Sequence, residues 1–182
     1  QIFETYIDAL DPNRSFFLRR DVERFKRNLS RLDDDLTRGK LDMAFEIFRL
    51  YRQRVDERVK YGLSLLEEGF DFDQDEKYRF DRSEADRAQT RAEIDEIWRK
   101  RVKNDWLGLL LSKKDEDEIP ELLRKRYEGI ARRVRQFDSD DVFQAFVNAY
   151  TQSLEPHTSY MSPSTSENFD ISMRLSLEGI GA

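Results

Sequence analysis

The sequence has no cysteine, a single histidine and few residues that break helices. Without cysteine, it cannot form disulfides, thiolate metal sites or a cysteine nucleophile. With His157 as its only histidine, it cannot build a metal site from several imidazoles. Seven glycines and four prolines leave few places to turn, so we expect long elements. No run approaches the roughly 18 apolar residues that would predict a membrane-spanning helix.

The residues that are present suit a helical domain with a real core. Of the 182 residues, 38% are hydrophobic and 12% aromatic, which excludes a disordered polymer. Another 38% are charged, as expected for long helices with solvated outer faces. The formal net charge of -6 argues against a nucleic-acid partner, since phosphate binding favours a positive surface.

Apolar residues recur every three or four positions and predict a series of amphipathic helices. The first spans residues 2–10 and ends at Asp11-Pro12, because proline cannot continue a helix. The second spans 18–36 and ends at Gly39. The third is capped by Asp42 and runs to Gly69, and its apolar stripe is Ala44, Phe48, Tyr51, Val55, Val59, Gly62 and Leu66. The second and third helices are predicted to form an antiparallel hairpin.

Residues 70–86 are acid-rich and lack a period, so they are predicted to form a loop. A long helix is expected to resume by about Ser83 or Glu84, and another begins at Pro120. A last main helix, capped by Asp138 or Ser139, has an inner face that includes Val142, Phe143, Phe146 and Tyr150. The predicted fold class is therefore all-α, a multi-helix orthogonal or antiparallel bundle. Its core is predicted to contain Phe25, Phe48, Trp98, Tyr127 and Phe146.

The pattern changes after Leu154-Glu155-Pro156, where proline ends the last main helix. Ser162-Pro163 predicts a short helix that runs to about Met173. Leu175 and Leu177 then alternate with polar residues, which indicates the start of a strand that leads into Gly179-Ile180-Gly181-Ala182.

Two motifs carry a resemblance to a known family. The sequence LEPHTSYMSP at 154–163, followed by LSLEGIGA at 175–182, resembles the segment that leads into the PDZ domain of carboxy-terminal processing proteases. The sequence LDPNRSFFL at 10–18 resembles the amino-terminal helical region of the same family. The resemblance implies that residues 1–174 are an amino-terminal helical domain and that residues 175–182 are the first strand and loop of a truncated PDZ domain.

The same resemblance implies a function. Members of this family are periplasmic serine proteases that trim or degrade proteins with apolar C-terminal tails. Their Ser/Lys catalytic pair lies in a domain beyond the PDZ domain, so no catalytic residue is expected in this chain. A lipoprotein adaptor built from tetratricopeptide repeats is an implied partner. The alternative is a free-standing helical interaction module without enzymatic activity.

The residues themselves offer little chemistry. A Ser-His-Asp triad could be drawn around His157, but no Gly-x-Ser-x-Gly motif accompanies it. The acidic runs at 33–35 and 138–141 do not follow a calcium-loop pattern, so no metal or other cofactor is expected. The charged run at 112–118 is read as a solvated loop, with a docking site as the alternative.

The pair of glycines near the end of the sequence is the exception. Two glycines around one apolar residue let successive backbone N–H groups converge on an anion. By resemblance to a PDZ carboxylate loop, Gly179, Ile180, Gly181 and Ala182 are the predicted substrate-binding residues, with Ile180 lining a pocket for the last apolar side chain. The alternative for this stretch is an ordinary turn at the end of a strand.

Overall fold

A computed structural model describes residues 1–29, 38, 40–155, 158, 160–161 and 166. Within these residues every regular element is helical, which confirms the predicted all-α class. The α-helices are α1 (Ile2–Leu10), α2 (Arg19–Lys26), α4 (Asp42–Glu68), α5 (Arg91–Leu111), α6 (Ile119–Gln136) and α7 (Ser139–Leu154), and a 3-10 turn, η1, spans Glu116–Glu118. The predicted short helix after Pro163 and the predicted strand at Leu175 lie outside the described residues. None of the described helices is long and apolar enough to cross a membrane.

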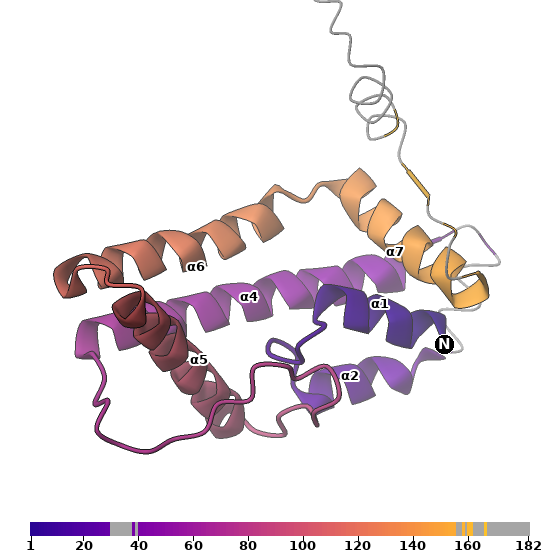
Figure 1. Cartoon of the computed structure of the whole chain (residues 1–182). Coiled ribbons are helices and arrows are strands. Elements are labelled where there is room, and N and C mark those ends of the chain that lie inside the picture. Colours follow the sequence, from indigo (N-terminus) through magenta and orange to yellow (C-terminus); the bar gives the residue numbers. More distant parts are fainter. Residues whose placement is uncertain (30–37, 39, 156–157, 159, 162–165, 167–182) are drawn as a thin grey trace, which may run out of the picture.

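Helix α4 is the centre of the bundle. It packs against α5, α6 and α7, and α1 in turn packs against α7 (Figure 1). Helices α4 and α6 are antiparallel, because Arg135 pairs with Asp56 at one end and Arg124 pairs with Glu67 at the other. Helix α5 runs obliquely to this pair (Figure 1). The bundle therefore combines antiparallel and crossing helices, as predicted.

The apolar stripe of α4 is confirmed at every predicted position. All seven of its residues are buried, and they form the floor on which the other helices pack. The helix begins one residue away from the prediction, since Leu41 is the N-cap and Asp42 the first helical residue. It ends at Gly69, whose φ of 73° lies in the region that favours glycine.

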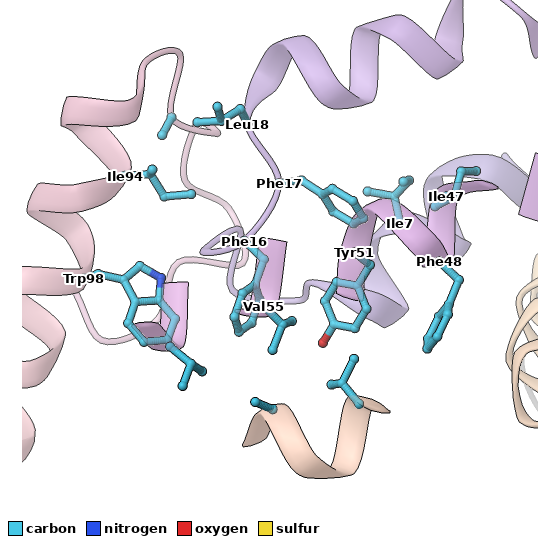
Figure 2. Packing of buried hydrophobic residues seen from close by; sticks show 14 of the residues in the cluster. Ile7, Phe16, Phe17, Leu18, Ile47, Phe48, Tyr51, Val55, Ile94 and Trp98 are labelled. Atoms are coloured by element: carbon cyan, nitrogen blue, oxygen red, sulfur yellow. The ribbon is translucent and has the colours of Figure 1, made fainter. Parts of the chain in front are cut away.

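The predicted core aromatics are also confirmed. Phe25, Phe48, Trp98, Tyr127 and Phe146 are each at most 5% exposed. Figure 2 shows part of this cluster, in which the ring of Phe16 lies 5.6 Å from those of Tyr51 and Trp98, in edge-on geometry. These contacts join the chain segment after α1 to α4 and α5 in one core.

The helix predicted over residues 18–36 is wrong as a continuous element. Helix α2 ends at Lys26, and the N–H of Asn28 donates to the carbonyl of Phe25 in a tighter turn. The side-chain amide of Asn28 donates to the carbonyl of Arg24 at 3.2 Å. Such local side-chain bonds compete with the helical ladder. Leu32, Leu36 and the expected stop at Gly39 lie outside the described residues, so the predicted hairpin stays a prediction.

The start of α5 was predicted several residues too early. Residues 83–90 are not helical because long-range hydrogen bonds hold them in another conformation. The Arg14 guanidinium donates to the carbonyl of Ala85 at 2.7 Å. The backbone N–H of Arg19 donates to the carbonyl of Ala88 at 2.9 Å. Helix α5 instead begins after Thr90, whose hydroxyl accepts the N–H of Glu93 at 3.2 Å.

Helix α7 begins as predicted, and its predicted inner face is confirmed at Val142 and Phe146 but not at Phe143 and Tyr150. Asp138 caps it by accepting the N–H groups of Asp140 and Asp141 at 2.8 and 3.0 Å. Phe146 packs inward, with its ring 5.2 Å from that of Tyr6 on α1. Phe143 and Tyr150, predicted to be inner residues, are 38% and 39% exposed. Phe143 lies instead against Tyr160, which follows the helix, with their ring centres 5.6 Å apart.

Two helical glycines differ in their surroundings and allow a test of the packing. A Cβ at Gly62 would lie 3.3 Å from the Trp98 ring, whereas a Cβ at Gly108 would have no neighbour within 4 Å. We predict that Gly108→Ala raises the free energy of unfolding by about 0.5–1 kcal/mol through helix propensity. Gly62→Leu should lower it by about 1–3 kcal/mol through overpacking. Urea denaturation measures both, and an unchanged stability in Gly62→Leu would contradict the close approach of α4 and α5.

Candidate functional site

The predicted substrate-binding residues Gly179, Ile180, Gly181 and Ala182 lie outside the described residues, as does His157. The described residues do include the other distinctive motif, at residues 10–18. Its residues 11–18 form a loop between α1 and α2, here called the Asp11 loop.

The Asp11 loop is wound around one buried carboxylate. Asp11 is fully buried and accepts the backbone N–H groups of Ser15 at 2.8 Å, Phe16 at 3.2 Å and Phe17 at 3.0 Å. Pro12 prevents α1 from continuing, because its ring lacks an N–H. The carboxylate thus satisfies amide groups that have no helical acceptor and that would be costly to bury alone.

A distant arginine completes the environment of Asp11. Arg87 donates to Asp11 at 2.6 Å and to Asp8 at 3.0 Å, and its guanidinium lies over the ring of Phe17. Burial raises the pKa of Asp11, and the Arg87 charge and the three backbone N–H groups oppose that rise. All of the groups described above as bonded to the carboxylate are donors, which is the environment expected for its ionised form.

The Asp11 loop also joins three parts of the bundle. It places Phe16 and Phe17 in the core against α4, where Tyr51 contacts both rings. The indole N–H of Trp98, on α5, donates to the carbonyl of Ser15 at 2.7 Å. The role of this loop is therefore structural, because it fixes α1, α4 and α5 relative to one another.

A groove of about 430 Å³ lies beside the Asp11 loop, between α1, α2 and the segment before α5. Phe3, Ile7 and Val22 supply its apolar lining. Its rim holds oppositely charged pairs, Lys26 with Glu4 at 2.8 Å and Arg19 with Asp86 at 3.2 Å, together with Arg87 and its acidic partners. Because these charges compensate one another, the groove has no clear preference for an anion or a cation.

A second groove, of about 600 Å³, lies between α4 and α6 and is here called the α4–α6 groove. Its apolar part consists of Val59, Leu63 and Ala131. Polar and charged residues surround that part, namely Asp56, Lys60, Glu128, Arg132, Arg135 and Gln136. This groove carries two cations without ion-pair partners among the described residues, Lys60 and Arg132.

The described residues hold no recognisable reaction centre. No group of three or more His, Cys, Asp or Glu side chains among them could hold a metal ion. Within the same residues, no Ser or Thr hydroxyl is hydrogen-bonded to a Lys or His side chain, as an activated nucleophile requires. The charged run at 112–118 is exposed, in agreement with a solvated loop.

Sequence reasoning missed the charged residues that lie inside the bundle. Arg58 is 2% exposed and pairs with Asp95 on α5, and Arg54 pairs with Asp21 on α2 at 2.8 Å. The helical period could have identified Arg58, because it lies three residues after Val55 on the buried side of α4. Arg87 carries no such signal, since it lies in a loop without a period and meets Asp11 across 76 positions.

Comparison with known proteins gives a consistent result. Residues 1–164 match the family model described as the tail specific protease N-terminal domain. The whole chain is also similar to the curated tail-specific protease of Haemophilus influenzae, with 40% identity over 182 residues. This alignment covers 100% of the chain but only 26% of that relative, so the chain spans about a quarter of the relative's length. Both matches include the Asp11 loop.

Proposed function

The chain belongs to the tail-specific protease family, and from this membership we propose that it is the amino-terminal helical scaffold of a periplasmic serine protease. Such a protease would trim or degrade proteins chosen by their C-terminal tails. The match of residues 1–164 to the family's N-terminal domain is the observation that carries the proposal. In this proposal the Ser/Lys catalytic pair lies outside residues 1–182.

We further propose a domain division, with residues 1–174 as the helical domain and residues 175–182 as the beginning of a PDZ domain. The change from helical to alternating periodicity at Leu175 supports this division. Gly179, Ile180, Gly181 and Ala182 would then bind the substrate tail. The two glycines would allow backbone N–H groups to meet the terminal carboxylate, and Ile180 would contact the last apolar side chain.

The helical domain would act as a rigid support and as a surface for protein partners. Its helices share one hydrophobic cluster, so forces on one helix are transmitted to the others. The Asp11 loop adds polar links between α1, α4 and α5. The proposed partners are protein substrates with apolar C-terminal tails and a tetratricopeptide-repeat lipoprotein adaptor.

Cleavage of matched substrates by the full-length protease tests the carboxylate role. A peptide substrate with an amidated C-terminus should be cleaved with a kcat/KM at least about tenfold below that of its free-acid form, because hydrogen bonds to a charged group contribute about 1.5–3 kcal/mol. Gly181→Val should reduce cleavage of the free acid similarly, since β-branched residues resist positive φ angles.

A small reagent directed at the catalytic serine is the control for both changes. It should react at the same rate with the wild-type protease and with Gly181→Val, because the substitution lies outside the proposed catalytic groups. Equal cleavage of amidated and free-acid tails by the wild-type protease would contradict the carboxylate role. Gly179 and Gly181 would then be assigned to an ordinary turn.

A further inference from the structure

The connection between α4 and α5 is the longest non-helical segment among the described residues. Residues 70–90, here called the strap, contain no helix or strand. The strap leaves the end of α4, passes α5 and ends beside the Asp11 loop (Figure 1). Connections longer than about 15 residues without regular structure are uncommon in compact domains and often have a function. Because each half of the strap makes specific contacts, its stability depends on how strongly each half is bound.

The second half of the strap, residues 82–90, is held by buried groups. Arg87 donates to the buried carboxylate of Asp11 at 2.6 Å. Ala85 and Ala88 are buried, and their carbonyl groups accept the hydrogen bonds described above. Detaching this half would break a buried ion pair, which is strongly destabilising. The second half should therefore stay in place as long as the domain is folded.

The first half, residues 70–76, is held by one carboxylate that solvent reaches. Glu76 pairs with Arg99, and with Lys103 at 2.5 Å, both on α5. Hydrogen bonds from these two cations lower the pKa of Glu76 to about 2, so the carboxylate is ionised at neutral pH. The side chains of Glu76 and Arg99 are 21% and 29% exposed. Ion pairs that solvent reaches contribute little and weaken as salt is added.

The first half covers a tryptophan whose polar group has no partner. The ring of Phe70 lies edge-on to that of Trp106 on α5, with the ring centres 5.8 Å apart, and Phe72 lies beside Phe70. The indole N–H of Trp106 is buried and has no hydrogen-bond acceptor among the described residues. Burial without an acceptor is destabilising, because the N–H has lost its hydrogen bonds to water. Opening of the first half would let water reach this N–H and remove that cost.

We propose that residues 70–76 open and close over α5 as a unit, while the second half of the strap stays bound to the Asp11 loop. Glu76 holds the closed position, and opening uncovers Trp106. The uncovered ring then adds to the exposed side chains of Leu107 and Leu111 at the same end of α5. This motion is independent of the binding of C-terminal tails proposed above, so the 182-residue chain alone is sufficient to test it.

The test measures hydrogen exchange of the indole N–H groups with water by NMR. The chain has two tryptophans, so both signals can be followed. Trp98, whose N–H binds the buried carbonyl of Ser15, reports opening of the core. In the wild-type chain, Trp106 should exchange at least about tenfold faster than Trp98, since regions with weak contacts open more often than the core. E76A should speed exchange at Trp106 by at least about fivefold and leave Trp98 within about twofold.

The matched control is D75A, which makes the same change in net charge at the neighbouring residue. Asp75 is exposed and has no ion-pair partner among the described residues. Exchange at Trp106 in D75A should stay within about twofold of the wild-type chain. Raising the NaCl concentration from about 0.05 M to about 1 M should speed this exchange in the wild-type chain and in D75A, because salt screens the Glu76 pairs. E76A should respond little, since it has already lost those pairs.

Three results would overturn the proposal. Unchanged exchange at Trp106 in E76A would show that Glu76 does not hold the strap. Equal increases in E76A and D75A would show a general effect of charge. Equal increases at Trp98 and Trp106 would show that the whole domain opens. Thermal melts check that each variant is folded, and E76Q, which keeps the shape of the side chain, should give a smaller increase in the same direction.

Discussion

Replacing Asp11 by alanine should lower the free energy of unfolding by about 3–5 kcal/mol, because breaking a buried ion pair leaves its partner charge uncompensated. The change would remove the acceptor of Arg87, whose side chain is 10% exposed. It would also leave the N–H groups of Ser15, Phe16 and Phe17 without the acceptor that they share in the folded chain. Urea denaturation at neutral pH, followed by circular dichroism, measures the loss.

Asp8→Ala is a matched control, since Asp8 binds the same arginine from a side chain that is 53% exposed. A pair exposed to this extent contributes little, so its loss should cost less than about 1 kcal/mol. The double variant D11A/R87A should be more stable than the sum of the two single losses predicts, because it leaves no buried charge unpaired and only the exposed Asp8 loses its partner. Similar losses in Asp11→Ala and Asp8→Ala would contradict the central place of Asp11 in the loop.

Features of the fold that are set by nearby residues could be predicted from the sequence. The stripe of α4, the caps at Thr90 and Asp138 and the ends of helices at Asp11 and Gly69 all follow from neighbours within a few residues. Of these, the sequence-based prediction contained the stripe, the Asp138 cap and both helix ends. It missed Thr90 as the N-cap of α5, because the residues from Ser83 to Gln89 also suit a helix and the predicted start was therefore placed earlier.

The errors arise where distant contacts override local preference. Residues 83–90 stay out of α5 because Arg14 and the N–H of Arg19 bind their carbonyl groups, and no local pattern indicates such partners. Phe143 was predicted to face inward, but it is 38% exposed and lies against Tyr160, which follows the helix. Phe137, at the end of α6, is 40% exposed although its ring lies 5.5 Å from that of Phe48.

In the candidate site, too, local features could be predicted from the sequence and distant contacts could not. Asp11-Pro12 was recognised as the end of a helix, but the role of its carboxylate depends on Arg87, which is far away in the sequence. The unpaired cations of the α4–α6 groove could not be found from composition, since the basic residues of α4 and α6 are interleaved with acids along the sequence. Only the antiparallel register shows which of those acids are already paired. The assignment of Gly179 and Gly181 stays a prediction.

The second large effect is expected at Trp98, where the Asp11 loop meets the helical core. Its side chain is fully buried beside Phe16 (Figure 2). Its ring lies 5.6 Å from that of Phe16 and 6.0 Å from that of Tyr127. Trp98→Ala should lower the free energy of unfolding by about 3–5 kcal/mol, since it removes a large side chain and leaves a cavity. Denaturant unfolding, followed by circular dichroism, measures this loss.

Trp98→Phe separates the indole hydrogen bond from the packing. It keeps most of the aromatic contact but leaves the buried carbonyl of Ser15 without the N–H that binds it at 2.7 Å. We expect a loss of about 1–3 kcal/mol from that unpaired group, smaller than the loss in Trp98→Ala. Leu111→Ala, at a residue that is 75% exposed on the same helix, should change stability by less than about 0.5 kcal/mol. If Trp98→Phe were as stable as the wild-type chain, the bond to Ser15 would contribute nothing and packing alone would connect the Asp11 loop to α5.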